Sequence, residues 1–233
     1  MARTRSGENM ETIQNRLYES SPYQGFAGDA YPPDVQGWGS DDPILSEIIM
    51  AIRPRRIAEI GSWKGRSAIN MARAVKSVGV KCEIVCIDTW LGSPEHWDRI
   101  AHPDWYGWLR LHHGYPHLYY TFLANVARAG LEDIITPFPS TSANAAVLFR
   151  RWGITFDLCY IDGAHEYQSV CRDLIDYWDL LGSDGVMLGD DYMIWPGVTQ
   201  AANDFAKHKN TQIYSKPGKF LMQKGNRLTI TTG

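Results

Sequence analysis

Five acidic side chains lie at or near the ends of short apolar segments, where they could share one site. They are Glu59, Asp88, Asp162, Asp190 and Asp191. Carboxylates that lie close together repel one another and are costly to remove from water, so such a group needs a counter-cation, a metal ion or the hydroxyl groups of a ligand. Each acid alone is equally compatible with an ordinary strand end in contact with solvent. The repeated pattern predicts a polar crevice.

The stretch AEIGSWKG, residues 58–65, predicts a tight turn between a strand and a helix. Gly61 and Gly65 let the backbone approach a ligand, and the first amides of the following helix point toward it. The turn lacks both the GK[ST] of a phosphate-binding loop and the GxGxxG of a dinucleotide site, and Glu59 would repel phosphate. Asp88 follows 27 residues after Gly61, where such sheets place the acid that binds ribose hydroxyls. Adenosine with a positively charged amino-acid tail fits these features, whereas a turn that only packs a helix on a strand is the alternative.

The stretch FDLCYIDGAHEY, residues 156–167, ends an apolar run at Asp162 and places His165 three residues later. Imidazole has an ordinary pKa near 6.5, so His165 can accept a proton at neutral pH. Its alternative roles are to cap a helix or to support a neighbouring residue. Successive side chains of a strand point to opposite faces, so Asp190 and Asp191 can act together only if the chain turns there.

Apolar strands alternate with amphipathic helices along the chain. Strands are expected at 57–60, 82–88, 133–138, 156–162, 185–191, 211–215 and 219–224. Helices are expected before and between them, at 40–52, 66–75, 117–130, 141–152, 166–181 and 197–208. This order predicts right-handed crossovers and an α/β fold, with a doubly wound, mostly parallel seven-stranded sheet covered on both faces. Ligands of such sheets bind beyond the carboxyl ends of the strands, where the acids lie.

The composition narrows the classes of partner. The 233 residues carry a formal charge of −3, so broad electrostatic binding to nucleic acid is not expected. No stretch approaches the roughly 20 apolar residues of a membrane span, and the N-terminus has no apolar signal segment. The four cysteines form no CxxC pair, which favours reduced thiols. We therefore expect a cytoplasmic protein that acts on small molecules, without nucleic-acid or membrane partners; a homo-oligomer is one of the open alternatives.

Two parts of the chain stand apart from this pattern. Residues 1–40 are expected to form an N-terminal arm or cap, ahead of one domain at 41–233. Five of the seven histidines and four of the nine tryptophans fall between Trp90 and His117. No zinc spacing such as HExxH occurs there. We predict an aromatic lid at about 90–115, since flat aromatic faces suit sugars or planar rings; packing within the lid or a subunit contact is the alternative.

Four motifs in order, EIGSWKGRS, CIDTW, IDGAHEY and GVMLGDDY, resemble those of the class I S-adenosylmethionine-dependent methyltransferases. Within that class they are most similar to the metal-dependent O-methyltransferase branch, which includes sugar O-methyltransferases of macrolide biosynthesis and cephalosporin-hydroxylase-like proteins. The resemblance runs from about residue 45 to 224. It leaves out the arm before residue 40 and the segment 90–115, which usually decide the methyl acceptor.

The resemblance implies a role for each matching residue. Asp88 would bind the ribose, Ser140 would lie near the adenine, and His165 would be the catalytic base. Relatives in this branch often have Glu where Asp190 stands. The implied magnesium ligands are Asp162, Asp190 and Asp191. The implied S-adenosylmethionine-binding residues are Glu59, Gly61, Ser62, Gly65, Ser67, Asp88, Thr89, Ser140 and Asp162.

The implied activity is S-adenosylmethionine- and Mg²⁺-dependent methylation of a hydroxyl of a sugar or polyhydroxylated small molecule. A dication would bind vicinal hydroxyls and lower the pKa of the reacting one, and His165 would accept its proton. The alternatives are a catechol-type enzyme with a planar diphenol acceptor and a non-catalytic cofactor-binding protein with the same fold. A nicotinamide-dependent oxidoreductase is disfavoured by the glycine pattern.

Overall fold

Seven strands form the sheet of this protein in a computed structural model that describes residues 12–229. Residues 1–11 of the expected arm and 230–233 of the expected domain lie outside the described residues. The strand order is β3-β2-β1-β4-β5-β7-β6. The parallel strands are β1 (Arg56–Ile60), β2 (Glu83–Asp88), β3 (Ile135–Pro139), β4 (Phe156–Ile161) and β5 (Leu181–Asp190). The antiparallel ones are β6 (Tyr214–Lys216) and β7 (Lys219–Gln223). The predicted doubly wound, mostly parallel α/β sheet is confirmed.

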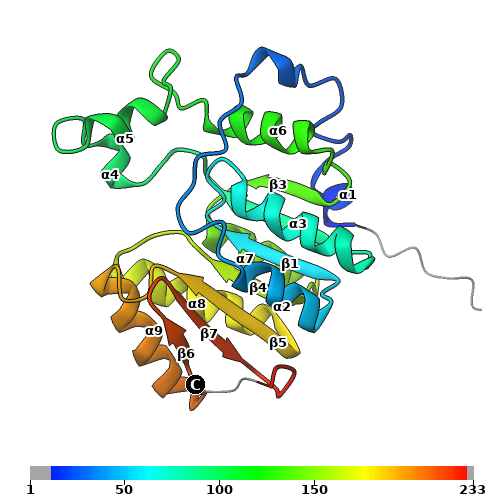
Figure 1. Ribbon diagram of the computed structural model, residues 1–233, viewed down its shortest axis with the longest axis vertical. Helices are drawn as coiled ribbons and strands as arrows, with labels where there is room; N and C mark the ends of the chain where they lie inside the picture. The colour runs from blue at the N-terminus through cyan, green and yellow to red at the C-terminus, as the bar shows by residue number, and fades with distance from the viewer. Residues whose placement is uncertain (1–11, 230–233) are drawn as a thin grey trace, which may run out of the picture.

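Helices cover both faces of the sheet (Figure 1). Side chains alternate along each strand, so Ile57 and Leu158 pack on one face while their neighbours Ala58 and Cys159 pack on the other. The first face carries α2 (Ile44–Ile52), α3 (Arg66–Val78) and α6 (Leu118–Ala129). The second face carries α7 (Ser142–Arg151), α8 (Tyr167–Leu180) and α9 (Pro196–Lys209), with the short α1 (Ile13–Leu17) packed through Ile13.

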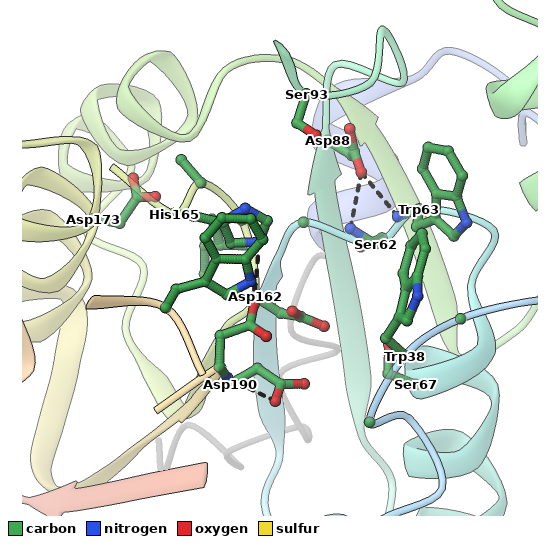
Figure 2. A pocket seen from close by; sticks show the side chains of 18 of the residues that line it. Trp38, Ser62, Trp63, Ser67, Asp88, Ser93, Asp162, His165, Asp173 and Asp190 are labelled. Atoms are coloured by element: carbon green, nitrogen blue, oxygen red, sulfur yellow. Dashed lines mark hydrogen bonds and ion pairs between the residues drawn. The ribbon is translucent and has the colours of Figure 1, made fainter. Parts of the chain in front are cut away.

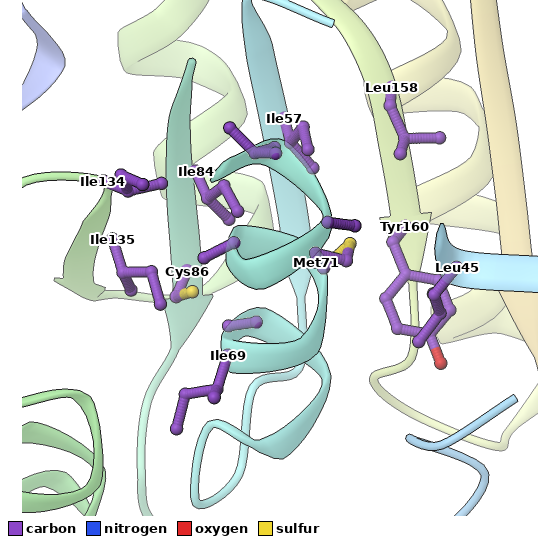
Figure 3. Packing of buried hydrophobic residues seen from close by; sticks show 14 of the residues in the cluster. Leu45, Ile57, Ile69, Met71, Ile84, Cys86, Ile134, Ile135, Leu158 and Tyr160 are labelled. Atoms are coloured by element: carbon purple, nitrogen blue, oxygen red, sulfur yellow. The ribbon is translucent and has the colours of Figure 1, made fainter. Parts of the chain in front are cut away.

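The helix α3 shows how the core holds the first ligand turn in place. Its buried side packs against Ile57, Ile84 and Cys86 of the sheet (Figure 3). Each fully buried Ile or Leu contributes about 1.5–3 kcal/mol, so the helix is firmly attached. Gly65 caps its N-terminus with a φ of 86°, in the left-handed region, and a Cβ there would meet the Phe122 ring at 2.9 Å. A glycine is therefore needed at the start of α3.

One boundary differs clearly from the expected one. The helix expected at 166–181 ends at Leu180, and β5 begins at Leu181, four residues earlier than expected. Leu181 pairs with Phe156, and the register then shifts before Leu158 pairs with Val186. Because the pairing is irregular, β5 can begin within the stretch LGSDG, residues 181–185, whose composition is typical of a turn. The error therefore came from tertiary pairing that local propensity does not encode.

The arm and the lid lie together at one end of the molecule. The lid contains two short helices that the sequence did not predict, α4 (Pro94–Trp97) and α5 (Pro103–Trp108), and they project from the sheet (Figure 1). The arm includes a short 3-10 helix, Gly28–Ala30, and brings Trp38 within 5.4–5.8 Å of the rings of Trp63, Trp105 and Trp108. The segment around Trp38 therefore contacts the lid, whereas α1 packs against the sheet. No helix within residues 12–229 is long and apolar enough to span a membrane.

Candidate functional site

A cleft of about 1270 Å³ opens beyond the carboxyl ends of the parallel strands. The strand order reverses between β1 and β4, which is where doubly wound sheets bind ligands. Its wall combines the turns after β1, β3 and β4, the ends of β2 and β5, part of the arm and part of the lid. A typical ligand pocket has roughly 300–1,000 Å³, so this cleft has room for two small molecules. Figure 2 shows its lining, with Asp88 and Ser62 facing His165, Asp162 and Asp190.

The carboxylate of Asp88 is held by backbone donors. Oδ2 accepts hydrogen bonds from the amides of Ser62 and Trp63, both at 2.9 Å, and Oδ1 accepts from the amide of Trp90 at 2.7 Å (Figure 2). Burial raises the pKa of Asp88, and these N–H groups act in the opposite direction. Backbone N–H groups therefore fix the orientation of this carboxylate at the wall of the cleft.

Glu59 does not contact the cleft and lies behind its wall. It is fully buried and accepts hydrogen bonds from Ser62 Oγ at 2.6 Å, Ser67 Oγ at 2.5 Å and Cys86 Sγ at 3.2 Å. Burial raises the pKa of its carboxyl group. Glu59 therefore positions two serines that do line the cleft, and its expected role in cofactor binding stays a prediction. Gly65 is also behind the wall, beneath the Phe122 ring.

The other expected cofactor residues line the cleft. Gly61 has a φ of 82°, and a Cβ there would lie 2.0 Å from the carbonyl oxygen of Asp162, so the turn after β1 packs directly on the end of β4. The amide of Ser140 donates to the carbonyl of Asp88 at 3.0 Å, which joins the ends of β2 and β3. The structure thus brings together, around one cleft, Gly61, Ser62, Ser67, Asp88, Thr89, Ser140 and Asp162.

Asp190 is engaged by a buried lysine. Lys219 forms an ion pair with Asp190 Oδ2, and the hydroxyl of Tyr160 donates to the same oxygen at 2.7 Å. Asp190 Oδ1 accepts from the amide of Asp191 at 2.8 Å. The backbone turns at Asp191, whose φ is 63°, so the two neighbouring acids separate. The chain therefore turns between Asp190 and Asp191, as joint action of the two acids requires. Their carboxylates nevertheless have different partners, Lys219 and His165.

His165 is held in a defined orientation. Its Nε2 lies 3.2 Å from Asp191 Oδ2, and its ring stacks on Trp195 at 4.3 Å with an interplanar angle of 2°. Within the described chain Nδ1 has no hydrogen-bond partner; it lies 3.8 Å from Glu95 Oε1. Burial lowers the pKa of His165, but the hydrogen bond and charge of Asp191, with the charge of Glu95, raise it by more. A proton on Nε2, bound to Asp191, leaves the Nδ1 lone pair available.

The acids as arranged do not fit a magnesium ion. Across residues 12–229, no three His, Cys, Asp or Glu side chains form a group that could ligate a metal. Both oxygens of Asp190 have partners, and Asp191 is bound to His165. Asp162 is the acid that remains, and burial together with the charges of Asp190 and Asp191 raises its pKa well above the usual value. The magnesium ligand set therefore stays a prediction from the resemblance.

The lid contributes aromatic rings and two polar atoms. The ring of His96 lies 4.4 Å from that of Trp63 and 5.5 Å from that of Trp105. The Nδ1 of His96 accepts from the amide of Ser93 at 3.2 Å, which places its proton on Nε2. In the described part of the chain, His96 Nε2 and Glu95 Oε2 are buried without hydrogen-bond partners. A donor and an acceptor are therefore available in the lid wall.

The arm contributes residues that the sequence analysis did not assign to the site. Gln36, Trp38 and Ser40 line the cleft, and Gln36 Oε1 accepts from the indole of Trp63 at 2.9 Å. The excess of tryptophan was the available signal, since Trp38 is the one tryptophan of the arm. Nothing local in the sequence indicates that it meets the lid.

Comparisons with known proteins agree with the fold. The chain is similar to the O-methyltransferase from Bacillus cereus in complex with SAH (TM-score 0.57, 16% identity, 86% of both chains). It is also similar to TomG from Streptomyces achromogenes, an O-methyltransferase of tomaymycin synthesis in complex with SAM (TM-score 0.56, 15% identity, 91% of this chain and 94% of that one). A third similar structure is the SAH-bound methyltransferase PaMTH1 of Podospora anserina (TM-score 0.53, 16% identity, 86% and 84%).

The sequence comparisons define the family. An uncharacterized protein of Sinorhizobium fredii, y4gI, is 25% identical over 155 residues, or 66% of this chain; the chain spans about 15% of that relative's length. A methyltransferase domain model matches residues 58–192, more than half of the chain and the part that carries the turn after β1, the end of β2, His165 and the paired acids. The chain therefore belongs to this methyltransferase domain family.

Proposed function

We propose that the protein transfers a methyl group from S-adenosylmethionine to a hydroxyl of a sugar or another polyhydroxylated small molecule. The observation that carries the proposal is the imidazole of His165 in the same cleft as the Asp88 turn. Asp191 and Trp195 fix the ring, and no described residue is a hydrogen-bond partner of Nδ1. The similar O-methyltransferases with bound SAM or SAH support the choice of cofactor.

The residues on the β1–β2 side fit this cofactor. The cofactor supplies a methyl group on a positively charged sulfur. Asp88 presents a carboxylate for a ribose hydroxyl, and Gly61 and Ser62 line the cleft in the turn after β1. Ser140 lies beside Asp88 at the end of β3 and suits the adenine. The acids of the cleft attract a cationic ligand, which agrees with the absence of a phosphate-binding pattern.

His165 suits the proton transfer. As the acceptor oxygen bonds to the methyl carbon, the carbon–sulfur bond breaks and its electron pair stays on sulfur. The oxygen must lose its proton, and His165 Nδ1, which has no hydrogen-bond partner among residues 12–229, can accept it. Asp191 keeps the other ring nitrogen protonated and so favours this tautomer. General-base catalysis of this kind contributes typically about 10²- to 10⁴-fold.

The lid favours a polyhydroxylated acceptor over a planar diphenol. The rings of Trp38, Trp63, His96 and Trp105 are tilted from one another by 33–63°, so they do not form a flat slot between parallel faces. Glu95 Oε2 and His96 Nε2 add an acceptor and a donor. Aromatic faces beside a carboxylate and an N–H suit the alternating carbon and hydroxyl surfaces of a sugar.

Several finer expectations remain predictions within this proposal. We keep a small-molecule acceptor, a cytoplasmic location, and no nucleic-acid or membrane partner. Magnesium, which the resemblance implies, is not a requirement of the proposal, because Asp190 is already bound by Lys219 and Tyr160.

The test is methyl transfer from methyl-labelled S-adenosylmethionine to a panel of acceptors. The panel contains monosaccharides, glycosides and nucleotide sugars in one arm and catechols in the other. We expect label in the sugar arm, at a hydroxyl located by mass spectrometry. Transfer confined to catechols would contradict the acceptor class, and a chain that binds S-adenosylmethionine yet labels neither arm would contradict the proposed activity.

A further inference from the structure

The position of Lys219 in the cleft is set by the backbone. Lys219 is the first residue of β7, and the antiparallel register of β5 and β7 pairs it directly with Asp190. Gly218 before it has a φ of 87°, and its amide donates to the carbonyl of Tyr192 at 2.8 Å, which fixes the turn into the strand. Residues directly opposite in an antiparallel ladder have Cβ atoms about 4.5–5.5 Å apart, so the two side chains can pair.

The ammonium of Lys219 is enclosed. The residue is 1% exposed, its Nζ lies 3.2 Å from the hydroxyl of Tyr160, and it pairs with Asp190 Oδ2. A Cβ on Gly39 would lie 2.9 Å from both Lys219 Nζ and Asp190 Oδ2, so the arm covers the pair. A buried ion pair is retained only when hydrogen bonds satisfy both charges, as they do here.

A resident ammonium already lies among the acids at the ends of β4 and β5. Lys219 is ion-paired with Asp190, while Asp191 accepts the Nε2–H of His165. Burial raises the pKa of Asp162, and the charge of Lys219 lowers it. A dication placed among these acids would lie beside a buried ammonium and would have to displace it from Asp190. Like charges at such short distances repel strongly in a buried site.

We propose that Lys219 is the resident cation of the acid group, so that the methyl transfer proceeds without a divalent metal ion. The inference rests on the proposed function of the same cleft. Lys219 is a positioning residue: it holds Asp190 against β7, and the chain then turns at Asp191, whose carboxylate reaches His165. The reaction remains balanced, because the hydroxyl proton goes to His165 and the electron pair of the broken bond goes to sulfur.

The test is a titration with Mn²⁺, an ion that favours oxygen ligands and is counted by electron paramagnetic resonance. The wild-type chain is expected to bind none in the cleft. Lys219→Met removes the ammonium and keeps an apolar stem of similar length, so the freed acids are expected to gain a single class of bound manganese. Lys219→Arg keeps a cation and is expected to bind none. Lys207→Met is the matched control, because Lys207 is exposed on α9 outside the cleft.

Manganese that binds the wild-type chain at the cleft and is displaced by Asp190→Asn would overturn the inference. So would a folded Lys219→Met variant that gains no manganese. The wild-type and Lys219→Arg arms still decide the matter if Lys219→Met does not fold. The titration needs neither acceptor nor methyl transfer, so it is read separately from the proposed function. Where an acceptor is in hand, wild-type activity is expected to be unchanged after dialysis against a chelator, and loss that magnesium restores would contradict the proposal.

Discussion

The two sides of the cleft bury carboxylates in different ways. On the side of β1 and β2, Asp88 and Glu59 are held by amides, hydroxyls and a thiol, all of them neutral donors. On the side of β4 and β5, Asp190 and Asp191 are held by Lys219 and His165. Neutral donors stabilise a carboxylate without cancelling its charge, whereas the ammonium of Lys219 cancels the charge of Asp190.

This difference predicts which ligand binds on which side. The β1–β2 side keeps its negative charge and suits a cationic ligand such as a sulfonium nucleoside. On the β4–β5 side, Lys219 compensates Asp190, so this side suits a neutral hydroxyl better than a second cation. We therefore expect the cofactor on the β1–β2 side and the acceptor on the β4–β5 side.

The largest expected effect tests the β4–β5 side alone. His165→Gln keeps a polar side chain but removes the proton acceptor, so kcat is expected to fall by roughly 10²- to 10⁴-fold. The affinity for S-adenosylmethionine, measured by calorimetry, is expected to stay unchanged because the Asp88 turn is untouched. His208→Gln, an exposed change on α9, is the control. A loss of cofactor affinity equal to the loss of activity would show that the two sides are not separate.

The second effect tests the β1–β2 side. Asp88→Ala removes the carboxylate that orients the Ser62–Trp63 turn, so the affinity for S-adenosylmethionine is expected to weaken roughly 10- to 100-fold, since hydrogen bonds to charged groups contribute about 1.5–3 kcal/mol each. Calorimetric titration measures it. Asp133→Ala, an exposed acid, serves as the control. Unchanged affinity would remove Asp88 from the ribose role.

The third effect concerns the cap that closes both sides. Trp38→Ala removes the arm ring that contacts Trp63, Trp105 and Trp108. Truncation of a central aromatic contact costs more than about 1 kcal/mol, so the KM for the acceptor is expected to rise by roughly 10-fold. The affinity for S-adenosylmethionine should change little. Trp97→Ala is the matched control, because Trp97 belongs to the lid but does not line the cleft. Equal effects of the two changes would mean that Trp38 only stabilises the lid.

The sequence predicted the strand ends and the site better than it predicted their partners. Asp88, Asp162 and His165 follow apolar runs. Because periodicity locates such runs, the sequence was enough to predict that these residues lie at one cleft. The role of Glu59 could not be predicted, because the sequence pattern is the same whether a strand residue faces a helix or a ligand. Lys219 lies 29 residues after Asp190 in chain order, and only the register of β5 and β7 brings them together. Trp38 meets the lid through packing that no local pattern encodes.

The smallest expected effect tests what happens to a buried carboxylate with neither a set of neutral donors nor a strong cation. Asp173 on α8 lines the cleft, and burial raises its pKa to about 6, against a hydrogen bond from Ser142. Its raised pKa means that its contribution to stability is full below the unfolded-state value near 4 and is lost as the pH rises through about 6. Asp173→Asn is therefore expected to raise the free energy of unfolding by roughly 1 kcal/mol at about pH 8 and to change it little at about pH 4. Urea titrations at both pH values measure it.

Asp176→Asn, one turn along the same helix, is the contrast. Asp176 is paired with Arg150 and Arg172, so its loss should destabilise the protein at about pH 8. If both changes shifted stability in the same direction at high pH, burial alone, and not the kind of partner, would govern the carboxylates of this protein.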